Sequence, residues 1–227
     1  MDRINYIYQT VQTVLNKNSK GVLSPERFNV LATMAQSTVV GSLINEYRDA
    51  INRRRINRGG PDIRELETAL SRYLVTKPLT VAAGETTMPD DLSYLPTDYL
   101  FYNDALITEI PSNEYTSYIS GIVTPSVTYP RCKVFGNKIK IFPNTINAVT
   151  INYYRRPLSP KWTYTTVNNE PVFDGSKADY QDIDVYENKI PDVIFNILEL
   201  SGVHLRDAEV VQVMEAMKTF NYRKDLQ

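Results

Sequence analysis

Few residues in this chain have the types and spacing that catalysis requires. It contains one histidine, His204, and one cysteine, Cys132. A single imidazole cannot form a paired-histidine metal site, and His204 lies in helical sequence without a partner nucleophile. Arg131 and Lys133 flank Cys132, and two cations would lower the pKa of its thiol and make it a nucleophile. The alternative that we favour is a buried strand thiol.

The acidic stretch between Asp174 and Asp192 is the other candidate ligand site. Its carboxylates do not follow the Asp-x-Asp-x-Asp-Gly order of a calcium-binding EF-hand loop. Gly59-Gly60-Pro61 lacks the Lys-Ser/Thr pair of a phosphate-binding loop. We therefore expect a solvated acidic loop, no metal, no cofactor and no enzymatic activity.

Arginines crowd the end of the second predicted helix. The cluster comprises Arg48, Arg53, Arg54, Arg55 and Arg58. The helix dipole favours cations at this end, so a solvated helix terminus explains them without a partner. Arginine also suits bidentate pairing with phosphate or carboxylate, and such a partner would be passing DNA or an acidic segment of a neighbouring subunit. The acidic interface candidates are Asp182, Asp184 and Glu187.

Composition excludes several other classes of protein. The 227 residues carry a formal net charge of -1, so any contact with DNA must be local. No apolar run is long enough for a membrane span, and the first residues lack a signal-peptide pattern. A single cysteine fits synthesis in a reducing cytoplasm. Sixteen tyrosines against one tryptophan suit strands and interfaces alike.

Periodicity predicts helices in the first third of the chain. Residues 2–16 place an apolar side chain at every third or fourth position. Ser24-Pro25 then supplies an N-cap and a proline at the first helical position, and the long helix that follows ends at Arg58-Gly59-Gly60-Pro61. Its expected buried face is formed by Phe28, Leu31, Ala35, Val39, Ser42 and Leu43. Pro61-Asp62 opens a third helix that reaches Leu74.

Strands are expected from Val75 to about Phe173, because prolines recur throughout this stretch and exclude a long helix. The clearest pair lies in residues 133–142 around a turn at Gly136-Asn137. Residues 148–154 form another strand, and residues 99–110 add one or two. One face of the strand at 148–154 is formed by Val149, Ile151 and Tyr153.

Helical sequence returns at Ile190-Pro191, and a last helix is expected over 207–222. The sequence thus predicts an α+β fold in which N- and C-terminal helices form a helical bundle with a central antiparallel β domain. The predicted regions are 1–74, helical; 75–173, β-rich; and 174–227, an acidic loop followed by helices that pack with the N-terminal ones.

Three short motifs lie between the leading and closing helices. They are Leu95-Pro96-Thr97-Asp98-Tyr99-Leu100, the hairpin from Gly136 to Pro143, and Tyr153-Tyr154-Arg155-Arg156-Pro157. Their succession resembles the head-to-tail connector proteins of short-tailed bacteriophages, including the tail tubular proteins. Residues 21–29, with Ala35-Gln36, further resemble ring proteins of crAss-like gut phages.

The resemblance covers about residues 20 to 220. It implies a homo-oligomeric ring of about twelve copies stacked on the portal protein, with further ring or tail proteins on its distal side. DNA would pass through the bore as cargo, no membrane would be involved, and the protein would lie at the portal vertex of the virion after synthesis in the bacterial cytoplasm.

Four residues of the third motif join the interface candidates: Tyr153, Tyr154, Arg155 and Arg156. Each motif also suits a turn in an unrelated α+β protein. The alternative function is a non-enzymatic DNA-binding module that uses Arg48 to Arg58.

Overall fold

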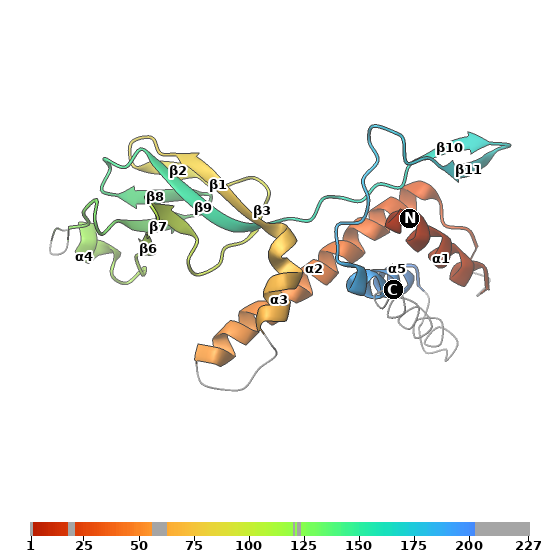
Figure 1. Ribbon diagram of the computed structural model, residues 1–227, viewed down its shortest axis with the longest axis horizontal. Coiled ribbons are helices and arrows are strands. Elements are labelled where there is room, and N and C mark those ends of the chain that lie inside the picture. Colours follow the sequence, from red (N-terminus) through yellow and green to blue (C-terminus); the bar gives the residue numbers. More distant parts are fainter. Residues whose placement is uncertain (1, 18–20, 56–62, 120, 122–123, 203–227) are drawn as a thin grey trace. The chain divides into compact units, whose positions relative to one another are not determined.

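The computed structural model describes residues 2–17, 21–55, 63–119, 121 and 124–202. These residues form a mixed α+β fold with five α-helices and several antiparallel sheets (Figure 1), which confirms the expected fold class. The chain divides into two compact units. We call Met1–Ala69 with Pro157–Gln227 the helical unit, and Leu70–Arg156 the strand unit.

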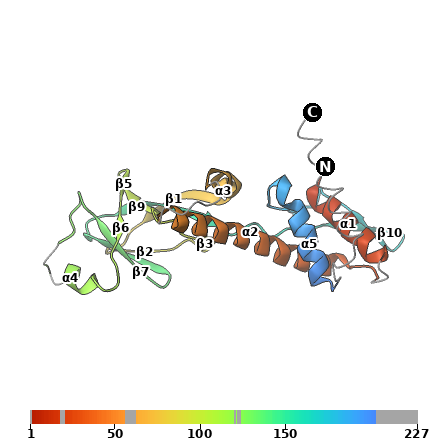
Figure 2. The ribbon, with the colours of Figure 1, turned by 90° about the horizontal axis from the view of Figure 1, so that it is seen from below.

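Three helices form the body of the helical unit. They are α1 (Arg3–Lys17), α2 (Pro25–Arg55) and α5 (Ile190–Leu200), the last preceded by the 3-10 turn η2 (Glu187–Lys189). Both α1 and α2 pack against α5, and Figure 2 shows the three side by side. A short helix, α3 (Ile63–Leu70), leads to the unit boundary. The helix expected at 207–222 lies outside the described residues.

The start of α2 follows the predicted capping pattern. The carbonyl oxygen of Ser24 accepts the Phe28 amide at 2.9 Å, and its hydroxyl lies 3.4 Å from the Arg27 amide. The predicted apolar face of α2 is buried, except at Ser42. Ser42 is exposed, and its hydroxyl donates to the Val39 carbonyl of its own helix at 2.8 Å.

Side-chain amides of α2 bind backbone from the other end of the chain. Asn29 accepts the Trp162 amide at 2.7 Å and donates to the Trp162 carbonyl at 3.1 Å. Gln36 donates to the Leu158 carbonyl at 2.7 Å and accepts the Asp184 amide at 2.6 Å. These bonds hold residues 157–184 along α2.

A hairpin that the sequence analysis did not resolve also belongs to the helical unit. Its strands are β10 (Tyr164–Val167) and β11 (Glu170–Phe173), and together they form a separate two-stranded sheet. Asn168 and Asn169 join them with φ values of 50° and 66°, as a type I′ turn requires.

The strand unit contains two sheets. In the first, the order is β1 (Leu74–Thr80), β9 (Ala148–Arg155), β4 (Leu100–Tyr102) and β5 (Ala105–Leu106), and β3 (Leu92–Tyr94) also pairs with β9. In the second, the order is β2 (Glu85–Thr87), β8 (Lys138–Phe142), β7 (Arg131–Phe135) and β6 (Thr108–Glu109). The 3-10 turn η1 (Ser71–Tyr73) and the short helix α4 (Tyr115–Ile119) complete the unit.

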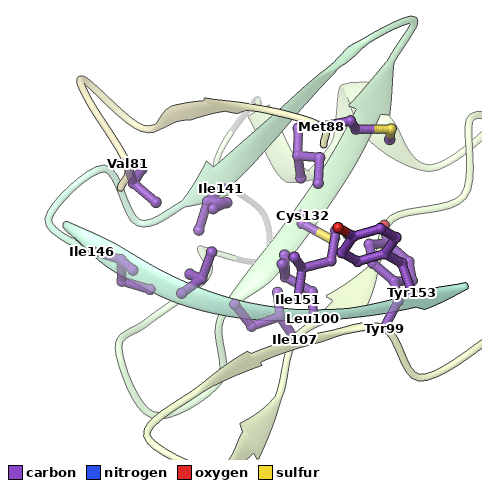
Figure 3. Close-up of a cluster of buried hydrophobic side chains, with 12 residues drawn as sticks. Val81, Met88, Tyr99, Leu100, Ile107, Cys132, Ile141, Ile146, Ile151 and Tyr153 are labelled. Atoms are coloured by element: carbon purple, nitrogen blue, oxygen red, sulfur yellow. The ribbon is translucent and has the colours of Figure 1, made fainter. Parts of the chain in front are cut away.

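One apolar cluster forms the core of the strand unit (Figure 3). The predicted hairpin at 133–142 is present as β7 and β8, with Gly136 in its turn at a φ of 56°. The predicted inward face of β9 is also confirmed, because Val149, Ile151 and Tyr153 are all at most 3% exposed. Period-two alternation was therefore sufficient to orient this strand.

The unit boundaries fall at 69/70 and 156/157. The structure thus assigns β10 and β11 to the helical unit, although they lie in the stretch 75–173 that was expected to form one β-rich region. The physical reason is the anchoring of the preceding residues to α2 by Asn29 and Gln36. Among the described residues, no helix is both long and apolar enough to span a membrane.

Candidate functional site

The arginine cluster lies at the C-terminal end of α2. Arg48 and Arg53 are exposed there. Arg54 and Arg55 belong to the same helix, but their side chains, and all of Arg58, lie outside the described residues. The helix dipole stabilises cations at this end, and the two exposed guanidinium groups are accessible to a carboxylate or a phosphate.

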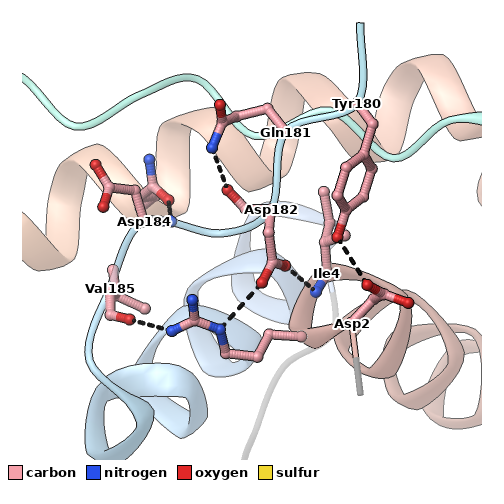
Figure 4. A network of polar contacts seen from close by, with 9 residues as sticks. Asp2, Ile4, Tyr180, Gln181, Asp182, Asp184 and Val185 are labelled. Atoms are coloured by element: carbon pink, nitrogen blue, oxygen red, sulfur yellow. Dashed lines mark hydrogen bonds and ion pairs between the residues drawn. The ribbon is translucent and has the colours of Figure 1, made fainter. Parts of the chain in front are cut away.

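The structure gives Asp182 an internal role (Figure 4). Its carboxylate accepts a hydrogen bond from Nε of Arg3 at 3.1 Å and one from the Ile4 amide at 2.8 Å. The Arg3 guanidinium also donates to the Val185 carbonyl at 2.9 Å. The first amides of a helix have no hydrogen-bond partner within the helix. Asp182 supplies one for the Ile4 amide and so stabilises the start of α1.

Asp184 is also committed to the helical unit. It is 6% exposed, and its carboxylate accepts the Leu158 amide at 3.1 Å. The expectation of a solvated acidic loop is therefore wrong for Asp184, because the loop turns this side chain inward to satisfy backbone. Of the three acidic interface candidates, Asp182 is half-buried and only Glu187, at the start of η2, is exposed.

The two tyrosines of the third motif are buried in the strand unit. Tyr153 is 1% exposed, and its hydroxyl donates to Oδ1 of Asp91 at 2.7 Å. Burial, and then this hydrogen bond, raise the pKa of Tyr153 to about 12. Tyr154 is 5% exposed and stacks on Tyr94 with ring centroids 6.0 Å apart. Neither tyrosine presents its ring to solvent.

The arginines of the same motif fix the end of β9. The guanidinium of Arg155 lies 5.7 Å from the centroid of the Tyr73 ring. Arg156 is exposed, yet its guanidinium donates to the Asp90 carbonyl and its amide donates to the Asp91 carbonyl at 2.7 Å. The third motif thus holds the end of β9 in place, and its two arginines are more accessible than its two tyrosines.

Cys132 lies in β7, in the interior of the strand unit (Figure 3). Burial raises the pKa of its thiol to about 11, and this outweighs the lowering by Lys133 and Arg131. The hydroxyl of Tyr99 lies 3.5 Å from the sulfur, and the pKa of Tyr99 is raised as well, chiefly by burial. The thiol is therefore protonated at neutral pH, as expected for a buried strand cysteine.

The helical unit also contains a cleft that no sequence pattern indicated. The cleft has a volume of about 490 Å³, and its walls come from the start of α2, from residues 161–166 and from the loop around Lys177 and Asp179. Trp162 is one of the lining residues, and its ring stacks on that of Tyr8 with centroids 4.1 Å apart. The two aromatic residues Trp162 and Tyr164, spaced as on one face of a strand, were the only pattern in the sequence that could have indicated this cleft. Nothing in the sequence indicates that the distant Tyr8 packs against Trp162.

Paired charges line this cleft. Tyr164 donates to Oε1 of Glu26 at 2.6 Å, which lowers the pKa of Glu26 and raises that of Tyr164. Lys161 and Asp179 form an ion pair at 2.6 Å, which lowers the pKa of Asp179. Nζ of Lys177 lies 5.9 Å from the centroid of the Tyr164 ring. The cleft therefore offers both signs of charge.

No family model matches this chain, and no curated protein matches it. Among the described residues, no group of three or more histidine, cysteine, aspartate and glutamate side chains is placed to hold a metal ion. His204 lies outside the described residues.

Proposed function

We propose that this protein is a structural virion protein, a subunit of the connector ring that joins portal and tail in a short-tailed bacteriophage. Its partners are further copies of itself, the portal protein and adjoining ring or tail proteins, with DNA as cargo in the bore. The finer fold that we propose is a bundle of N- and C-terminal helices that carries a central antiparallel β domain.

The observation that carries the proposal is the way the strand unit is inserted. Its first and last long strands, β1 and β9, pair from Leu74 opposite Tyr154 to Thr80 opposite Ala148. The chain therefore enters and leaves the strand unit at neighbouring points, while the flanking segments build one helical unit. A molecule of two separately cored units presents two kinds of surface, which suits an adaptor between different proteins.

The motifs behind the resemblance support the proposal through their positions. Leu95 to Leu100 leads into β4, and Tyr99 and Leu100 at its end are buried. Gly136 to Pro143 contains β8, and Tyr153 to Arg156 ends β9. All three motifs thus lie where strands of the strand unit begin, turn or end, and their order matches the order on which the resemblance rests.

Electron microscopy of the purified protein and of intact virions tests the proposal. We expect rings in the purified sample, and the same ring at the portal vertex of the particle. Mass spectrometry of purified virions gives an independent readout. Absence of the polypeptide from virus particles would contradict the proposal.

The arginine cluster can be tested separately. We expect Arg53→Gln, Arg54→Gln and Arg55→Gln together to weaken assembly, measured as molecular mass by light scattering. The matched control removes three positive charges from the strand unit, by Lys77→Gln, Lys138→Gln and Lys140→Gln. Unchanged assembly of the arginine variant would exclude the cluster from subunit contacts.

The exposure of Arg48 and Arg53 at one helix end favours a second candidate function, a DNA-binding module. When arginine side chains bind DNA phosphates, they release the counterions condensed on the DNA, so this kind of binding weakens steeply as the salt concentration rises. Titration of duplex DNA at two salt concentrations separates the candidates. A connector subunit shows little affinity for free duplex at either salt, whereas the module binds tightly at low salt only.

A further inference from the structure

The outward face of the hairpin β7–β8 combines cations with aromatic rings. Cys132 and Ile141, both 0% exposed, point into the core of the strand unit (Figure 3). Successive side chains of a strand point to opposite faces, so the residues on either side of these two point outward. The register sets the outward residues in three cross-strand pairs: Arg131 with Phe142, Lys133 with Lys140, and Phe135 with Lys138.

A third ring joins the two phenylalanines of this face. The ring centroid of Tyr115, in α4, lies 5.3 Å from that of Phe135 and 6.4 Å from that of Phe142. The three rings therefore form one band. Phe135 is 47% exposed, and Tyr115 and Phe142 are half-buried, so a ligand can reach all three. Accessible aromatic rings stack on the bases of an unpaired nucleic-acid strand.

The strands of this second sheet also carry an excess of positive charge. They contain four cations, all in β7 and β8, and two acids, Glu85 in β2 and Glu109 in β6. One cation is committed to the fold, because Nζ of Lys133 donates to the Ile110 carbonyl at 2.9 Å and lies 3.5 Å from Glu109. Without this pair, three cations remain against one acid.

The three remaining cations are open to an anionic ligand. Lys138 lies 3.6 Å from Glu85, but the two side chains are 66% and 47% exposed, and exposed ion pairs are weak. In the described part of the chain, Arg131 and Lys140 form no ion pair. Nζ of Lys140 lies 5.5 Å from the centroid of the Phe142 ring, so positive charge and aromatic surface adjoin each other.

This combination of charge and rings favours one class of ligand. Cations bind the phosphates of any nucleic acid, whereas aromatic side chains stack on bases only where the bases are unpaired. A duplex would leave the rings unused, because its base faces are stacked inside the helix. An acidic peptide would use the cations alone. The rings therefore favour an unpaired strand.

We define the aromatic-basic face as Tyr115, Arg131, Phe135, Lys138, Lys140 and Phe142. We propose that the aromatic-basic face binds single-stranded nucleic acid. Phosphates contact its three cations, and bases stack on its three rings. This activity is additional to the ring function, and its site is separate from the arginine cluster, which belongs to the helical unit.

Binding of a labelled oligothymidylate to the full chain, measured by fluorescence anisotropy, tests the proposal. We expect saturable binding at low salt that weakens as the salt concentration rises. The variant Arg53→Gln, Arg54→Gln and Arg55→Gln removes most of the arginine cluster, and it should still bind the single strand at least tenfold more tightly than a duplex of equal length. Absence of binding at low salt, or equal affinity of this variant for duplex and single strand, would contradict the proposal.

Three single substitutions test the charges of the face. Lys140→Gln should weaken binding and lower the slope of log affinity against log salt by about 0.7, which corresponds to one phosphate contact on a single strand. Glu85→Gln should strengthen binding, because it removes the acid beside Lys138. Lys77→Gln, in β1 of the first sheet, is the matched control and should change neither quantity. If Lys140→Gln behaves like Lys77→Gln, the proposal fails.

Phe135→Leu tests the rings. Phe135 is half exposed, so the fold should persist, as monitored by circular dichroism. Loss of one stacked base should lower the affinity by about tenfold and leave the salt slope unchanged, because stacking releases no counterions. Phe101→Leu, at a half-buried position in β4 of the first sheet, is the matched control. Equal affinities of these two variants would exclude stacking at the face.

Photochemical crosslinking of the oligothymidylate to the wild-type chain does not depend on any variant. We expect crosslinked peptides that contain Tyr115, Phe135 or Phe142, identified by mass spectrometry. Crosslinks found only elsewhere in the chain overturn the proposal. None of these results bears on ring formation, which electron microscopy measures separately.

Discussion

In the strand unit, apolar side chains from one continuous stretch of the chain form a single core. The helical unit instead joins segments from both ends, and several of its ties are polar. The Ile4 amide reaches Asp182 across 178 positions, and Asn29 reaches Trp162 across 133. The difference shows how one chain can combine a locally encoded unit with one that forms only when distant segments meet.

The pairing of β1 with β9 affects how easily the two ends of the chain can meet during folding. Once Leu74 and Tyr154 are paired, the chain that must close between Asn29 and Trp162 is effectively shorter. Closing a shorter loop costs less conformational entropy. We infer that a folded strand unit makes assembly of the helical unit easier.

The largest expected effect is that of Ile151→Ala, in the core of the strand unit. Ile151 is 0% exposed, and truncation should lower the free energy of unfolding by about 2–5 kcal/mol. Circular dichroism in denaturant measures the change. Leu106→Ala is the control, because Leu106 is already 40% exposed and should cost far less.

The same variant tests whether the units unfold separately. Trp162 is the one tryptophan of the sequence and lies in the helical unit, so its fluorescence reports on that unit alone. We expect its midpoint to move less than the midpoint by circular dichroism. Equal shifts of both signals would show that the two units unfold together.

The second prediction concerns Cys132, which reports on the strand unit from inside. With its pKa raised from 9.0 to about 11, the native thiol should react with iodoacetamide at pH 8 about a hundredfold more slowly than the unfolded thiol. Mass spectrometry of timed samples measures the rate. Rapid labelling of the native protein would contradict a closed core.

Ionisation of the same thiol makes the stability of the strand unit depend on pH. Because its pKa is higher in the folded than in the unfolded state, its contribution to stability is complete below pH 9 and is lost as the pH rises to about 11. Denaturant midpoints across that range should fall, and Cys132→Ala should flatten the fall.

The third prediction moves to the polar ties of the helical unit. Asn29→Ala removes a donor and an acceptor for the Trp162 backbone and should cost about 1–3 kcal/mol. Trp162 fluorescence in denaturant measures it. Asn113→Ala, at an exposed position of the strand unit, is the control. Little change in the fluorescence midpoint for Asn29→Ala would mean that apolar packing alone holds this unit.

The smallest effect is expected for Asp182→Asn. The ion pair with Arg3 is partly exposed, with side-chain exposures of 33% and 25%, and the asparagine still offers an oxygen to the Ile4 amide. We expect a loss of at most about 1 kcal/mol, smaller still at high salt, in denaturant titrations. Glu187→Gln, which alters an exposed acid nearby, should have no measurable effect.

Two hairpins of this protein show where prediction from sequence succeeds and where it stops. The pair β7–β8 was found because apolar residues stand on both sides of the turn Gly136-Asn137, and in β8 they alternate with lysines. The pair β10–β11 was not resolved, because its residues are mostly exposed and show no apolar alternation, and only Asn168-Asn169 marks its turn. Its strands bury little, so hydrophobic patterning carries little information there.

Local rules were enough to predict the start of α2 at Ser24-Pro25, the inward face of β9 and the α+β class. The burial of Asp184, the dominance of burial over two neighbouring cations at Cys132, and the cleft beside β10 became visible only in the folded chain. Capping and alternation depend on residues that are neighbours in the sequence. Desolvation and hydrogen-bond partners depend instead on what the rest of the chain brings into contact.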